Sequence, residues 1–171
     1  MSKLLVFVQR IWVHDTKIGS VTALGTLSPK KIIIICWALI AEELGWRGFL
    51  QEKLYAYFSD FTSPLIAGVI WAAWHYHYFI SGSKTVPIIL FALGCVTDSY
   101  VYYALTKLVK GNTIPATIFH FSGNLCFSLF LINPEYNHGS IVPYLLFVVS
   151  SFIAAVIVTA LTHKCRARVL V

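Results

Sequence analysis

Long runs of apolar residues separated by short polar segments dominate the sequence. A helix that crosses the hydrocarbon core of a bilayer needs about 20 mostly apolar residues, each adding about 1.5 Å of length. The segments between the runs combine proline or glycine with small polar residues, which is typical of turns between helices. The pattern predicts an all-α fold, a polytopic transmembrane helix bundle with about five spanning helices. The expected spans are residues 32–50, 64–80, 86–106, 114–132 and 141–162.

Proline falls at or near the expected first turn of the last four of these helices. A proline there is tolerated because the N–H that it lacks would have no partner within the helix. These prolines therefore support the predicted helix starts. They are Pro64, Pro87, Pro115 and Pro143.

Residues 1–30 differ from the rest of the chain because they mix charged and apolar positions, and no stretch among them is long enough to span a membrane. We interpret them as an interfacial or amphipathic lead-in. Residues 31–165 form the expected membrane domain, and residues 166–171 form a short basic tail.

The composition excludes an ordinary soluble domain. Hydrophobic residues make up 58% of the 171 residues, charged residues only 12%, and the mean hydropathy is +0.76. A soluble domain is typically about 45–50% apolar and about 25% charged. The net charge of +6 does not indicate nucleic-acid binding, because the basic residues are scattered at the ends of apolar runs and form no basic face. The lipid bilayer is the expected partner, and the oligomeric state is left open.

The cysteines do not resemble a disulfide framework or a zinc knuckle, because all four are far apart in the sequence. Three of them, Cys36, Cys95 and Cys126, lie within apolar segments. We expect these three to act as small buried hydrophobic residues.

The lysines and arginines near the helix ends predict an orientation, because cytoplasmic loops carry more of them. We expect the end with the larger group, which includes the C-terminus, to face the cytoplasm at the plasma membrane. The larger group is Lys53, Lys107, Lys110, Lys164, Arg166 and Arg168, and the smaller is Lys30, Lys31 and Lys84.

Several polar residues lie inside the expected spans, where an ionisable side chain costs about 2.5–3.5 kcal/mol on insertion scales and is a functional candidate by default. They are Glu42, Glu43, Arg47, His75, His77, Asp98, His120 and Asn124.

The spacing of these residues predicts which of them share a helix face. Glu43 and Arg47 are four residues apart and can form an ion pair, whereas Glu42 points about 100° away from Glu43. His120 and Asn124 are also four apart and share a face.

The two histidines of the second span cannot share a face, because His75 and His77 are two residues apart. His75 lies deeper in the span, whereas His77 lies among aromatic residues typical of a membrane interface. We therefore expect His75, and not His77, to face the centre of the bundle.

Three helices can thus bring a free carboxylate, a paired carboxylate, imidazoles and an amide together. A poorly solvated carboxylate is a better base near neutral pH, and imidazole and amide groups can stabilise a developing oxyanion. The set is suited to hydrolysis by an activated water. Glu42, His75 and His120 would also make a ligand set for a catalytic zinc or a similar divalent metal, although the helical His-Glu-x-x-His motif is absent.

Structural roles compete with these interpretations. Glu43 and Arg47 can be a purely structural ion pair, and His120 with Asn124 can hydrogen-bond between helices. Asp98 is expected to be a hydrogen-bond partner inside the bundle or a helper in the site. A proton or ion transporter would also use such residues, but the chain has no internal duplication of the kind that many transporters contain.

Three short motifs together resemble those of the CAAX prenyl endopeptidase and bacteriocin-processing (CPBP) family of intramembrane proteases. The stretch "EELGWR" resembles its Glu-Glu-x-x-x-Arg motif. The stretch "WAAWH" is similar to its Phe-x-x-x-His motif, with Trp71 in place of phenylalanine, and "HFSGN" is similar to its His-x-x-x-Asn motif. The resemblance covers about residues 30–130.

The resemblance implies a role for each motif residue. Glu42 would activate the attacking water, with Glu43 and Arg47 in support. The implied task of His75 is to orient the water or the carboxylate. By the same resemblance, His120 and Asn124 would stabilise the oxyanion; the resemblance leaves metal-dependent and metal-free chemistry open.

The expected substrate is a peptide or a prenylated protein at the membrane, in CAAX-type processing or in bacteriocin maturation or self-immunity. Family members usually carry further spanning helices before the first motif, and this chain reaches that motif almost at once. A truncated reading frame, a natural short form and a subunit of a larger assembly are therefore all open. The alternatives to a protease are a non-catalytic immunity or binding protein of the same fold and a small ion-coupled transporter.

Overall fold

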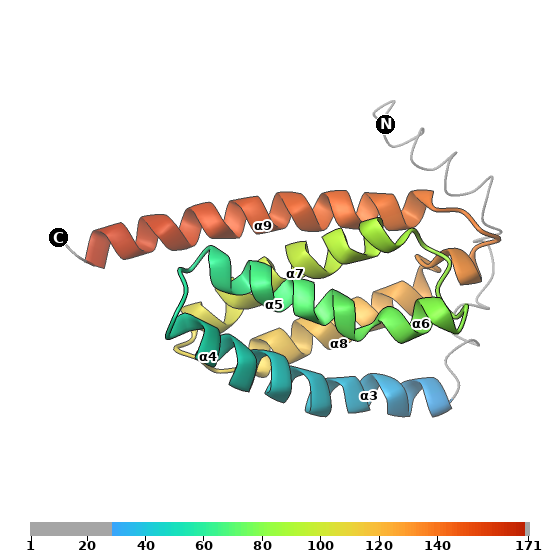
Figure 1. Cartoon of the computed structure of the whole chain (residues 1–171), viewed down its shortest axis with the longest axis horizontal. Helices are drawn as coiled ribbons and strands as arrows, with labels where there is room; N and C mark the ends of the chain where they lie inside the picture. Colours follow the sequence, from blue (N-terminus) through green and yellow to red (C-terminus); the bar gives the residue numbers. More distant parts are fainter. Residues whose placement is uncertain (1–28, 170–171) are drawn as a thin grey trace.

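The computed structural model describes residues 29–169, and these residues form helices and turns without any strand. The chain passes back and forth along one axis (Figure 1). The elements are α3 (Pro29–Glu43), the π-helix η1 (Leu44–Leu50), α4 (Gln51–Tyr55), α5 (Thr62–Trp74), α6 (Tyr76–Ile80), α7 (Ile88–Leu108), α8 (Ile114–Leu129), the 3-10 helix η2 (Pro134–Tyr136) and α9 (Val142–Val169). The predicted all-α bundle is confirmed. The predicted lead-in lies almost wholly outside the described residues.

Three stretches of the described residues are long and apolar enough to cross a membrane: Ile88–Leu108, Ile114–Tyr136 and Val142–Thr162. They correspond to the last three predicted spans. The first predicted span lies within one continuous helical run through α3, η1 and α4. The second is divided into α5 and α6.

The division falls at His75, whose backbone angles of φ −85° and ψ 1° depart from the α-helix. The hydropathy pattern does not reveal the break, because apolar and aromatic residues continue on both sides of it. The break places a histidine at the end of α5.

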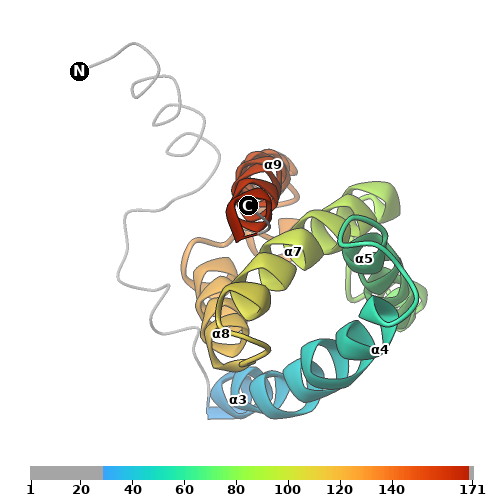
Figure 2. The ribbon, with the colours of Figure 1, turned by 90° about the vertical axis from the view of Figure 1, so that its left-hand side faces the viewer.

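Helix α7 is the central element, because it packs against α5 on one side and α9 on the other. Helix α3 packs against α8. Seen along the axis, α3, α4, α5, α7 and α8 form a ring, and α9 lies outside it against α7 (Figure 2). The ring is closed by hydrogen bonds as well as by apolar contacts: Gln51 Nε2 of α4 donates to Thr106 Oγ1 of α7 at 2.6 Å.

The outward faces of the helices are strongly apolar. Ile33, Ile80 and Ile89 are 68%, 77% and 74% exposed, as expected for side chains that face lipid. The prediction of buried cysteines is wrong for Cys36 and Cys126, which are exposed, and right for Cys95. An apolar segment in a membrane bundle has a lipid-facing side, so an apolar neighbourhood in the sequence does not imply burial within the protein.

The prolines occupy the predicted starts. Pro115 and Pro143 are the second residues of α8 and α9, Pro87 is the N-cap of α7, and Pro64 is the third residue of α5. Each position lies within the first turn, where a missing N–H is tolerated.

Gly68 marks the closest approach of α5 to α7. A Cβ at this position would lie 2.6 Å from Val96 Cα and 3.1 Å from the Cys95 carbonyl oxygen. Because the atoms in the way belong to the backbone of α7, the two helices would have to move apart to make room for a Cβ.

We expect Gly68→Ala to lower the free energy of unfolding in detergent by about 1–3 kcal/mol. Gly123→Ala on α8, where no atom lies within 4 Å, is the matched control and should not destabilise. Equal stability of the two variants would contradict this packing.

Candidate active site

A cavity of about 440 Å³ lies within the bundle and is lined by residues of α3, α5, α7, α8 and α9. Four of the six predicted site residues line it, and they come from three separate elements. The other two, Glu43 and Arg47, are buried and are not among the residues that line it. The four lining residues are Glu42, His75, His120 and Asn124.

Glu43 is the centre of a buried polar network. Its carboxylate oxygen Oε1 lies 2.9 Å from Arg47 Nη1 and 2.7 Å from His120 Nδ1. Glu43, Arg47 and His120 are 0%, 4% and 7% exposed. The predicted ion pair between Glu43 and Arg47 is therefore present, and the contact of Glu43 with His120 ties the first helical run to α8.

Two aromatic rings enclose the Arg47 guanidinium. Its Cζ lies 3.8 Å from the ring centroid of Tyr102 on α7 and 4.6 Å from that of Trp71 on α5. A cation over an aromatic face gains about 2 kcal/mol or more when it is desolvated. The network thus connects the first helical run to α5, α7 and α8.

Glu42 has a different environment from its neighbour. It is half-buried and lines the cavity. The indole Nε1–H of Trp71 donates a hydrogen bond to Glu42 Oε2 at 3.0 Å. Within the described part of the chain, no hydrogen bond reaches the other oxygen, Oε1. One oxygen is therefore held in place while the other is available to a ligand in the cavity.

His75 reaches the cavity from the break between α5 and α6. Its Nδ1–H donates to the Trp71 carbonyl oxygen at 2.8 Å, because a carbonyl can only accept. Its ring stacks on Tyr78 at a centroid distance of 5.7 Å. These contacts leave Nε2 as the free ring nitrogen. His77 is exposed and does not line the cavity, as the spacing predicted.

His120 is oriented by the carboxylate behind it. Glu43 is paired with Arg47 and therefore accepts, so His120 Nδ1 carries a proton and Nε2 is left for the cavity. Asn124 follows one turn later on α8 and also lines the cavity. The predicted shared face of these two residues is confirmed.

Asp98 of α7 accepts a hydrogen bond from the Ser151 hydroxyl of α9 and also lines the cavity. The predicted bundle-facing hydrogen bond is present, and it ties α9 to α7.

A π-helix immediately follows the two glutamates. Gln51 N–H bonds to the Trp46 carbonyl oxygen five residues back, in place of the usual four. The wider turn includes Gly45 and Gly48, and Arg47 lies within it. Such π-helical turns are frequent at functional sites.

The residues present do not form a metal centre. Across residues 29–169, no group of three or more His, Cys, Asp or Glu side chains lies close enough together to hold a metal ion. The trio considered from the sequence, Glu42, His75 and His120, lines one cavity without meeting at one point. We therefore derive no step through a metal.

Three residues of the site were not predicted from the sequence: the Trp71 indole N–H, Tyr102 beneath Arg47, and Lys84, which lines the cavity. Trp71 belongs to the "WAAWH" motif, so the sequence could have indicated that its indole N–H donates a hydrogen bond within the site. Tyr102 and Lys84 carried no local signal, because only the tertiary fold brings them to the site.

The fold and the site define a class: helical membrane proteins with a cavity in the bundle that several titratable side chains line. Residues 26–126 match the family described as type II CAAX prenyl endopeptidase Rce1-like. The chain belongs to this family.

One curated relative, CAAX prenyl protease 2 of Methanococcus maripaludis, is 27% identical over 113 residues, which cover 61% of this chain. The chain spans 42% of that relative's length. No solved structure matches the chain.

Arg47→Met should lower the free energy of unfolding by about 3–5 kcal/mol, because it leaves the Glu43 carboxylate buried without its cationic partner. Lys53→Met is the matched control, because Lys53 is exposed on the same helical run; its change should stay within about 0.5 kcal/mol. Unfolding in mixed detergent micelles measures both. A loss for Arg47→Met no greater than that for Lys53→Met would show that the network does not hold the fold.

Proposed function

We propose that this chain is an intramembrane endopeptidase that cleaves a peptide bond of a membrane-associated substrate with a water activated by Glu42. The observation that carries the proposal is the convergence of a carboxylate, two imidazoles and an amide on one cavity inside a membrane bundle. The family and the protease named among its relatives support the same class of reaction.

The geometry suggests how the first step proceeds. Glu42, held through Oε2, takes a proton from water through Oε1, and the water oxygen attacks the carbonyl carbon of the scissile bond. The carbonyl oxygen becomes an oxyanion. The Asn124 amide donates to it, as does His120 through Nε2–H when the ring carries both protons. Glu43 holds the His120 ring in place throughout.

In the second step the tetrahedral intermediate collapses and the C–N bond breaks. The proton held by Glu42 passes to the leaving amine, which restores the carboxylate. His75 Nε2 faces the same cavity and serves to orient the water. No metal is needed to balance these steps.

We propose a CAAX-type substrate, a prenylated protein or peptide at the membrane, in line with the name of the relative, CAAX prenyl protease 2. A substrate with an internal leader sequence and a purely binding role are the alternatives that the next experiment separates.

Glu42→Gln and His120→Ala should each reduce cleavage of a prenylated C-terminal peptide by about 100-fold or more, because each removes a group that acts in the transition state. The assay uses protein in nanodiscs, with leader peptides as a second panel and a chelator in parallel. Glu52→Gln is the control for Glu42→Gln, because Glu52 is exposed on α4 and away from the cavity.

Retained hydrolysis in folded Glu42→Gln would contradict the role of Glu42. Loss of activity with chelator would show that a metal is required. A folded wild-type protein that binds these peptides without cleaving them would support the binding role instead.

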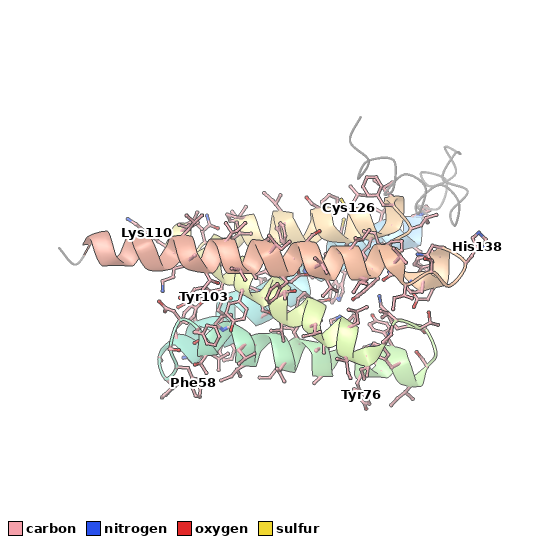
Figure 3. All side chains as sticks on the ribbon, turned by 90° about the horizontal axis from the view of Figure 1, so that it is seen from above. Phe58, Tyr76, Tyr103, Lys110, Cys126 and His138 are labelled. Atoms are coloured by element: carbon pink, nitrogen blue, oxygen red, sulfur yellow. The ribbon has the colours of Figure 1, made fainter. Side chains whose placement is uncertain are left out.

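We also propose that the end of the bundle with Lys53, Lys107 and Lys110 faces the cytoplasm at the plasma membrane. Lys110 and His138 lie at opposite ends of the bundle (Figure 3). In a cysteine-free background, Lys110→Cys should resist an impermeant thiol reagent added to intact cells, whereas His138→Cys should react. The reverse labelling pattern would invert the orientation.

A further inference from the structure

Lys84 is a lysine whose side chain enters the cavity. It lies in the turn between α6 and α7, is partly buried and lines the same cavity as Glu42. Its Nζ lies 5.7 Å from the ring centroid of Phe91 and donates to Asn133 Oδ1 at 3.4 Å. By contrast, Lys30, Lys53, Lys107 and Lys110 are exposed.

The charge of Lys84 is not balanced by an ion pair within the described residues. The Glu135 carboxylate acts on Lys84 electrostatically but forms no ion pair with it, and it accepts from both the N–H and the hydroxyl of Thr85. Burial lowers the pKa of Lys84 from its usual value, which reflects the cost of holding an ammonium away from water. An anion entering the cavity would offset that cost.

The position of Lys84 is fixed by contacts between two turns at the same end of the bundle (Figure 1). The bonds from Thr85 to Glu135 and from Lys84 to Asn133 join the α6–α7 turn to the α8–α9 turn. Val86, 2% exposed, anchors the first turn in the core. The turn that carries the Lys84 ammonium is therefore held by side-chain contacts against a second turn and against the core.

We propose that Lys84 binds the C-terminal carboxylate of the substrate, so that the cavity takes a peptide by its free carboxyl end. The inference rests on the proposed function, because it treats the ligand of the cavity as the peptide that Glu42 hydrolyses. A terminal carboxylate is an anion that every peptide end carries whatever its side chains. The ammonium on one wall and the Glu42 carboxylate on another then fix which bond near the end lies beside the water.

The test compares one prenylated peptide as its free acid and as its C-terminal amide, with wild type, Lys84→Met and Lys84→Arg in nanodiscs. Wild type should prefer the acid by about 10- to 100-fold in kcat/KM, the range for a hydrogen bond to a charged group. Most of the difference should appear in KM. Lys84→Met should lose that preference and cleave the acid and the amide with similar kcat/KM, whereas Lys84→Arg should retain part of the preference.

Equal cleavage of acid and amide by wild type would overturn the proposal while leaving the protease intact. An equal loss on both peptides in Lys84→Met would do the same, because it would indicate a general structural role. A third peptide, amidated and carrying an acidic side chain near its end, identifies the anion. If the acidic side chain restores fast cleavage of the amidated peptide by wild type but not by Lys84→Met, the site binds a side-chain carboxylate. That result would contradict the proposal.

Binding of fluorescent acid and amide peptides to Glu42→Gln tests the site without catalysis. A preference for the acid that disappears in Glu42→Gln/Lys84→Met supports the carboxylate site even if no peptide is cleaved. Equal affinity for the two peptides contradicts it. Failure of the proposed hydrolysis and failure of the Lys84 site therefore give different results.

Discussion

A buried charge network is the constraint on which the rest of this structure depends. A charged side chain inside a membrane bundle is costly unless it is paired or faces a water-filled cavity. Glu43 meets this condition through Arg47 and His120, and Arg47 lies against the faces of Trp71 and Tyr102. Because these five residues come from the first helical run, α5, α7 and α8, the contacts made by one carboxylate oxygen, Glu43 Oε1, and by its partner Arg47 join four parts of the ring.

The same constraint separates two neighbouring glutamates. Since Glu43 points into the network, the helical geometry turns Glu42 toward the cavity. There it receives one hydrogen bond, from Trp71, and keeps an oxygen for a ligand. The two glutamates of this motif therefore have different surroundings, as the resemblance implied: Glu43 lies in the buried network, and we propose Glu42 as the base. Trp71 contacts both parts of the site: its ring face lies against Arg47 of the network, and its N–H donates to Glu42.

Local periodicity was enough to predict much of this arrangement. The four-residue spacings predicted the ion pair and the shared face of His120 and Asn124. The apolar runs and their prolines predicted the helices. What the sequence did not indicate depends on tertiary contacts or backbone detail: the break at His75, the π-helical turn, and the entry of Lys84 into the cavity. In each case the same apolar composition is compatible with more than one helix or turn geometry. The sequence pattern therefore does not distinguish between these geometries.

A double-mutant cycle on unfolding free energy tests most directly whether the two glutamates are divided in this way. One cycle combines Glu43→Gln with His120→Phe, and the parallel cycle combines Glu42→Gln with His120→Phe. We expect a coupling energy of about 1–3 kcal/mol in the first cycle, because the two side chains share a buried hydrogen bond. In the second cycle we expect a coupling within about 0.5 kcal/mol of zero. A larger coupling of His120 to Glu42 than to Glu43 would contradict the division.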